Sequence, residues 1–294
     1  MSNPPIVSEV LSIPEFERQP FERRALSSTI LTCVTWLIAV VGSVPLFSVI
    51  YMLIKEGGAR LDMEALTALP PAGFETGGGF GNAIVGTAVM VLIATVISVP
   101  IGILSAIHLA VLDPASRLTR TTQFVAKTLT GFPSILAGVF TYAILVISFG
   151  YSAFAGGIAL SVLMLPTVVL AAEEAMKQVP QKMIDAAYGM GCTPTQVILK
   201  VVLPTALPGI ITGVMLAVAG AAGNSAPLLF TALFSNYYLS ELMEPTASLS
   251  ILIYNFSAMP FDNQIQLAWS ASLVLVLIVL VFNILARLIS RSNV

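Results

Sequence analysis

Charged side chains are scarce in this sequence. Lysine, arginine, aspartate and glutamate together make up 10% of its 294 residues, and the net charge is only −2. Soluble globular domains carry about a quarter charged residues. We therefore expect a membrane protein rather than a soluble domain. Its expected partner is a lipid bilayer, and no nucleic-acid partner is expected.

Histidine and cysteine, the residues that most often bind metals, are also rare in this sequence. His108 is the only histidine, and the two cysteines, Cys33 and Cys192, fall in a predicted span and a predicted loop, where they are not expected to pair. This excludes the usual metal-ligand spacings, and no nucleophile with a neighbouring base is evident. We expect no catalytic residue, no metal and no cofactor in this chain. The polar first 24 residues also lack the early apolar core of a cleavable signal peptide.

Apolar residues dominate instead. They make up 57% of the chain, and the mean hydropathy is +0.94. A helix needs about 20 apolar residues to cross a bilayer. Six runs reach that length, and they cover residues 26–54, 82–112, 124–149, 153–176, 205–234 and 265–289. The sequence therefore predicts an all-α polytopic membrane protein with six transmembrane helices.

Lysine and arginine predict the orientation, because they are enriched in cytoplasmic loops. The two termini and the even-numbered loops carry 11 of them, whereas the other side carries two. Both termini are therefore expected in the cytoplasm. This divides the chain into a cytoplasmic tail (1–24), a six-span domain (25–289) and a cytoplasmic C-terminus (290–294). The six-span domain would have external loops at 55–81 and 235–264 and a cytoplasmic loop at 177–204.

The loop at 177–204 has the pattern of two short helices joined by a turn. Pro180 suits the first position of a helix, and Gly191 suits the left-handed residue that ends one. Thr193 and Pro194 together provide a new N-cap and a first-turn proline, and Pro204 predicts the next break. An amphipathic helix, a glycine turn and a second short helix are expected here.

The spacing within this loop resembles the "EAA" loop of ABC importer permeases. The matching residues are Asp185-Ala186-Ala187, Gly191 and Val201-Val202-Leu203-Pro204, with Asp for Glu and Val for Ile. The resemblance implies the type I importer (MetI-like) fold and a loop that docks into a groove on an ATPase subunit. An ordinary cytoplasmic loop between two spans is the alternative.

Two groups of polar residues within the spans are candidates for a translocation path. Asn224, Ser225 and Pro227 follow a glycine-rich stretch, where a proline frees backbone groups. Thr130 and Ser134 lie on one predicted helix face. In both groups, hydrogen bonding between neighbouring helices is the alternative role. Glu173 and Glu174 are interpreted as the solvated end of the fourth span.

Several further stretches resemble one family, the PstA-type permeases of phosphate-specific (Pst) ABC importers. They include Gly77-Gly78-Gly79, Gly131-Phe132-Pro133-Ser134-Ile135, Ala226-Pro227-Leu228-Leu229 and Leu267-Ala268-Trp269. The resemblance covers about residues 75–294. It implies a phosphate importer in the bacterial cytoplasmic membrane, with a PstC-type second permease, a dimer of PstB-type ATPase subunits and an external PstS-type binding protein. The rivals are the same fold importing sulfate, molybdate or tungstate, and an intramembrane enzyme or autonomous channel.

The sequence departs from this family at two positions. The resemblance implies an Arg near the middle of the fifth span and Gly-Glu-Thr-Ala-Pro after it, where this chain has Gly220 and Gly223-Asn224-Ser225-Ala226-Pro227. An Arg and a Glu four residues apart on a helix could pair, so losing both together is self-consistent. The loss removes the candidate phosphate-steering cation from this chain.

Overall fold

The computed structural model describes residues 23–291. The predicted tail at 1–24 and the predicted C-terminus at 290–294 lie almost entirely outside this range. The chain divides into two compact units, residues 1–52 and 53–294, which are described separately. All regular structure in the described residues is helical.

Helix α1 (Arg23–Gly57) supplies the described part of the first unit. Its side chains from Ser27 to Met52 are almost all exposed, including Trp36, Leu37 and Phe47. Thr32 and Thr35 donate hydrogen bonds to the backbone carbonyls four residues earlier, which satisfies their hydroxyls inside an apolar helix. By length and hydropathy this helix can cross a bilayer.

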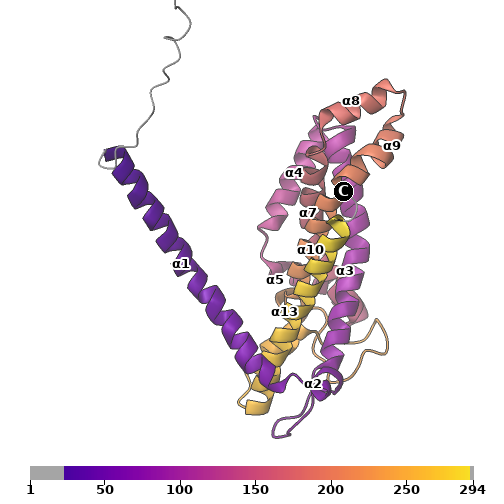
Figure 1. The fold of residues 1–294 in the computed structure, drawn as a ribbon. Coiled ribbons are helices and arrows are strands. Elements are labelled where there is room, and N and C mark those ends of the chain that lie inside the picture. Colours follow the sequence, from indigo (N-terminus) through magenta and orange to yellow (C-terminus); the bar gives the residue numbers. More distant parts are fainter. Residues whose placement is uncertain (1–22, 292–294) are drawn as a thin grey trace, which may run out of the picture. The chain divides into compact units, whose positions relative to one another are not determined.

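Long helices lying side by side form the second unit (Figure 1). Helix α3 packs along α7, and α7 packs along α10, which also contacts α13. Small residues allow the close approach, as where Gly102 of α3 faces Val168 of α7. The bounds are α3 Gly81–Ile107, α7 Ala153–Lys177, α10 Leu203–Ala222 and α13 Asp262–Arg291. Together with α1 these are the five described helices that are long and apolar enough to cross a membrane, and a bent pair raises the number to six if it forms one span.

The bent pair corrects the predicted third span. Residues 124–149 do not form one straight helix, because α4 (Arg117–Thr130) and the segment Ser134–Phe149 meet at 104°. That segment comprises α5 (Ser134–Thr141), a π-helical turn (Tyr142–Val146) and α6 (Ile147–Phe149). Pro133 explains the break, since a proline disfavours helical backbone in the residue before it.

The predicted fifth span also differs. The chain runs helically from α9 (Pro194–Val197) through a π-helical turn (Ile198–Val202) into α10, so the predicted break at Pro204 is wrong. Pro204 lies at the start of α10, directly after the wider π turn, where a proline is tolerated. Helix α10 ends at Ala222, and α11 (Ala226–Leu229) follows. Asn224 therefore lies past the end of a helix and not within a continuous span.

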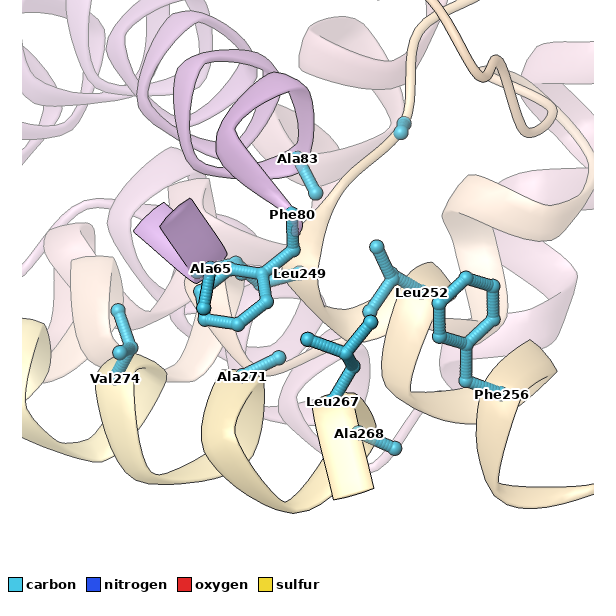
Figure 2. Packing of buried hydrophobic residues seen from close by; sticks show 11 residues of the cluster. Ala65, Phe80, Ala83, Leu249, Leu252, Phe256, Leu267, Ala268, Ala271 and Val274 are labelled. Atoms are coloured by element: carbon cyan, nitrogen blue, oxygen red, sulfur yellow. The ribbon is translucent and has the colours of Figure 1, made fainter. Parts of the chain in front are cut away.

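The end of the bundle opposite α8 and α9 has a close-packed apolar core (Figure 2). Phe80, Leu249 and Leu267 are fully buried there, at the junction of α3, α12 (Leu249–Ser257) and α13. The short 3₁₀ helix Gly58–Arg60 and α2 (Met63–Thr67) cover this end. Asn263 and Gln264 of α13 donate hydrogen bonds to backbone carbonyls of residues 71–77, which fixes the loop before α3.

Candidate functional site

Helix α8 (Gln181–Gly189) lies at one end of the bundle and carries three of the six predicted ATPase-coupling residues, Asp185, Ala186 and Ala187 (Figure 1). Pro180 lies at its N-cap, so the helix begins one residue later than predicted. At its other end Gly191 has φ +85°, as predicted. The Gly191 N–H donates to the Tyr188 carbonyl and the Cys192 N–H to the Ala187 carbonyl. These two bonds form a Schellman motif, which closes the helix.

The next helix starts as predicted. The Thr193 hydroxyl accepts from the Gln196 N–H, and the Gln196 side chain accepts from the Thr193 N–H. This reciprocal capping box, together with Pro194 in the first turn, begins α9. The turn between α8 and α9 is thus specified on both sides by local hydrogen bonds.

Two apolar side chains, Ala187 and Ile184, pack α8 against the bundle. Ala187 is buried in the cluster that also contains Met176, Val197 and Val202, and Ile184 packs against the same cluster. Ala187 therefore packs against the bundle, and its role in ATPase coupling stays a prediction. Leu203 and Pro204 lie at the start of α10, separate from the exposed face of α8.

The outer face of α8, together with Met190 at its C-cap, is exposed and carries large apolar side chains. Asp185 and Ala186 are exposed, and Asp185 accepts a hydrogen bond of 2.9 Å from Gln181. Met183, Tyr188 and Met190 are 45%, 45% and 78% exposed. Exposed apolar side chains beside a carboxylate are typical of a protein-docking surface. The Asp-Ala-Ala spacing predicts Asp185 and Ala186 on this face, but it contains no signal for the exposed Tyr188 beside them.

Three of the five candidate path residues line one hollow between α4, α5, α7 and α10. It has a volume of about 230 Å³. Thr130, Ser134 and Asn224, all predicted from the sequence, line it. Ser225 and Pro227 do not. Pro227 is buried, and its backbone lies against Gly138 of α5.

The hollow has polar groups and no charge. Among the described residues, its lining contains no lysine, arginine, aspartate or glutamate. The Thr130 hydroxyl donates to the Lys127 carbonyl, whereas Ser134, Thr167 and Asn224 form no side-chain hydrogen bond with another described residue. Two hydroxyls and one amide are therefore free to bind a polar solute.

Nine lining residues were not among the predicted path residues, and two of them bear on the chemistry of the hollow. Thr167 of α7 carries a hydroxyl, as does Ser161 of the same span, and a hydroxyl among apolar residues was the available signal. Gly220 also lines the hollow, and a Cβ placed on it would meet no atom within 4 Å. The two positions at which the sequence departs from the resembled family, Gly220 and Asn224, thus face the same space.

Glu173 corrects a further expectation. It is 3% exposed, so it is not part of a solvated helix end, whereas the neighbouring Glu174 is exposed. Its carboxylate is paired with Lys177 of the same helix and accepts a hydrogen bond from Gln123 of α4.

Comparison with known proteins identifies the family. Residues 98–293 match the family described as "Binding-protein-dependent transport system inner membrane component". The chain is 36% identical to the "Phosphate transport system permease protein PstA" of Pasteurella multocida, over 91% of this chain and 96% of that protein. It is 34% identical to the "Probable phosphate transport system permease protein PstA" of Methanocaldococcus jannaschii, over 92% and 96%.

Solved structures agree on the fold. A bacterial alginate ABC transporter superposes with a TM-score of 0.64 at 15% identity, over 94% of this chain and 98% of that one. The inward-facing MetNI methionine ABC transporter gives 0.58 at 21% identity, over 74% and 94%. These likenesses support the MetI-like importer fold expected from the sequence. The chain is therefore a multi-pass integral membrane protein that belongs to the PstA family of ABC importer permeases.

Proposed function

We propose that this chain is the permease subunit of an ATP-driven inorganic phosphate importer in the bacterial cytoplasmic membrane. The assignment of phosphate as the substrate is supported by one observation. This chain is 34–36% identical, over nine-tenths of its length, to permeases named for phosphate transport. The chain would form half of the translocation path. ATP hydrolysis would belong to a partner subunit.

The assembly would contain a PstC-type second permease, two PstB-type ATPase subunits and a PstS-type phosphate-binding protein. Helix α8 is proposed as the contact with the ATPase, since it exposes Asp185 and three large apolar side chains outside the bundle. Its end of the molecule would lie in the cytoplasm, together with both chain termini. A short helix closed by a Schellman motif and followed by a capping box can move as a rigid body, which suits this role.

The hollow beside Asn224 is proposed as part of the path. Broken helices in transporters typically line a solute site, because their unpaired backbone groups need a polar surrounding. Here α4 and α10 end and α5 begins around one space, and neutral hydrogen-bonding side chains face it. Alternating access would open this space in turn to each side of the membrane.

The test is uptake of radiolabelled phosphate into proteoliposomes that hold this chain with the three partner types. ATP-dependent uptake that excess sulfate and molybdate do not inhibit is expected. Uptake inhibited by either anion would reassign the substrate to another oxyanion. Conductance from this chain alone, without an ATPase, would replace the importer by a channel.

A further inference from the structure

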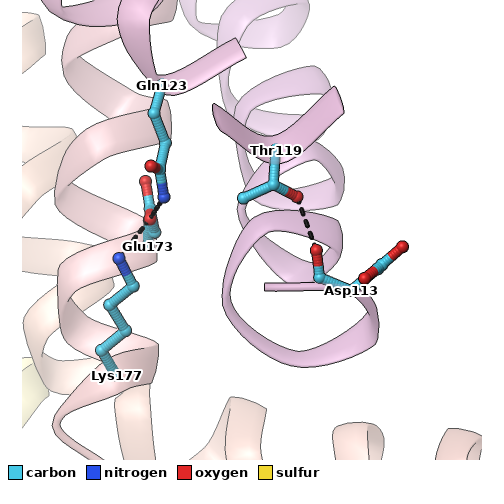
Figure 3. A network of polar contacts seen from close by, with 5 residues as sticks. All are labelled: Asp113, Thr119, Gln123, Glu173 and Lys177. Atoms are coloured by element: carbon cyan, nitrogen blue, oxygen red, sulfur yellow. Dashed lines mark hydrogen bonds and ion pairs between the residues drawn. The ribbon is translucent and has the colours of Figure 1, made fainter. Parts of the chain in front are cut away.

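A buried carboxylate joins α4 and α7, two of the helices that line the hollow. Glu173 of α7 accepts a 2.5 Å hydrogen bond from the side-chain amide of Gln123 of α4 (Figure 3). The ammonium of Lys177 lies 2.5 Å from the same oxygen. A buried charge needs such partners, and one of the two comes from a different helix. The contact therefore fixes α4 relative to α7.

Helix α4 presents this contact on the same face as the hollow. Thr119, Gln123, Ala126 and Thr130 follow one another at spacings of four, three and four, which places them on one side of a helix. Thr119 and Ala126 are buried, and Thr130 lines the hollow. The start of α4 is also bonded to the segment before it, because the Thr119 hydroxyl donates a hydrogen bond of 2.7 Å to the Asp113 carbonyl (Figure 3).

The two helices cover similar distances between the contact and the hollow. Gln123 precedes Thr130 by seven residues, and Glu173 follows Thr167 by six. At 1.5 Å per residue these are about 10 Å and about 9 Å. The α7 end of the contact is also close to α8, since Lys177 is the last residue of α7 and α8 begins at Gln181.

We propose that Glu173 is a positioning residue that transmits movement of α8 to the hollow by holding α4 against the end of α7. When α8 moves, the end of α7 moves with it, and the Glu173–Gln123 bond carries α4 and Thr130 along. Without the bond, α8 could respond to the ATPase while Thr130 stayed in place. The inference rests on the proposed function, because it assigns the coupling step to the same hollow.

The test compares variants in the assembled complex in proteoliposomes by the number of ATP molecules hydrolysed per phosphate imported. Gln123→Leu removes the cross-helix bond and keeps the Glu173–Lys177 pair, so the complex should still assemble. We expect its ratio to rise at least fivefold. Glu174→Gln is the matched control, because it removes an exposed carboxylate one residue away, and its ratio should stay within twofold of the wild type.

A double variant that exchanges the side chains of Gln123 and Glu173 distinguishes a coupling role of their hydrogen bond from a merely structural role of either residue. Gln123→Glu combined with Glu173→Gln places the carboxylate on α4 and the amide on α7, so the bond is kept with donor and acceptor exchanged. The double variant should return the ratio to within twofold of the wild type. A Gln123→Leu ratio within twofold of the wild type, or a swap as uncoupled as Gln123→Leu, would overturn the proposal.

Basal ATPase activity, measured without binding protein or solute, is a second measurement that does not depend on phosphate. It should rise at least threefold in Gln123→Leu and not in Glu174→Gln. If the wild-type complex imports no phosphate, the proposed substrate is wrong, yet this comparison still decides the role of Glu173. Unchanged basal activity in Gln123→Leu would refute that role.

Discussion

Gly220 and Asn224 lie four residues apart and line the same hollow, Gly220 in the last turn and a half of α10 and Asn224 just past its end. Neither carries a charge, and a Cβ on Gly220 would meet open space. A side chain introduced at either position would therefore extend toward the proposed solute. This relationship makes the charge of the hollow directly testable.

The first prediction concerns charge in the hollow. Asn224→Glu should lower phosphate uptake at least tenfold while the complex still assembles. Two like charges about 5 Å apart repel by about 3 kcal/mol at an effective dielectric constant of about 20. Uptake into proteoliposomes measures the effect, with Asn224→Gln as the neutral control. Equal uptake by the two variants would remove Asn224 from the path.

A restoring variant sharpens this prediction. Adding Gly220→Arg to Asn224→Glu places opposite charges four residues apart, a spacing that allows pairing. Uptake should recover at least fivefold over Asn224→Glu alone. No recovery, in a complex that assembles normally, would indicate that the two positions do not share the space through which the anion passes.

The second prediction concerns the turn after α8. Gly191→Val should reduce the amount of ATPase subunit that copurifies with the permease. The left-handed conformation at φ +85° costs a residue with a Cβ about 1–2 kcal/mol, and a β-branched residue more. Gly189→Ala is the matched control, because Gly189 is helical and has the same open surroundings. Equal copurification of ATPase by both variants would contradict the proposed role of the turn.

The third prediction concerns the charge on α8. Asp185→Lys should weaken ATPase binding at least fivefold, because it reverses the charge on the proposed docking face and removes the hydrogen bond from Gln181. Titration of the ATPase subunit against permease in detergent measures this affinity. Glu241→Lys makes the same charge change on an exposed residue outside α8 and should have no effect. Similar affinities for both variants would identify α8 as an ordinary loop helix.

The fourth prediction concerns the packing that shapes the hollow. Gly138→Ala would place a Cβ 2.7 Å from the Pro227 Cα, where only glycine fits. Overpacking of this kind costs about 1–3 kcal/mol. The midpoint of heat-induced aggregation of the purified permease should therefore fall. Gly220→Ala adds the same methyl group to open space and should leave the midpoint unchanged, so a shared shift would refute the packing argument.

Local sequence determined much of what was predicted correctly. Hydropathy alone identified the long apolar helices α1, α3, α7 and α13, because burial in lipid demands long apolar runs with internally bonded backbones. The turn at Gly191 and the cap at Thr193 were also predictable, since both depend on hydrogen bonds within a few residues. The orientation and the ATPase contact made by Asp185 stay predictions.

Tertiary structure decided the rest. Pro133 breaks its span while Pro204 does not, because a π-helical turn precedes Pro204 and accommodates its ring. Helix α8 buries Ala187 rather than Met183, because Ala187 is on the side that packs against Met176, Val197 and Val202. Glu173 is buried because Gln123, 50 residues away in the chain, supplies a partner for its carboxylate. Such contacts depend on which helices meet, and neither hydropathy nor local spacing contains that information.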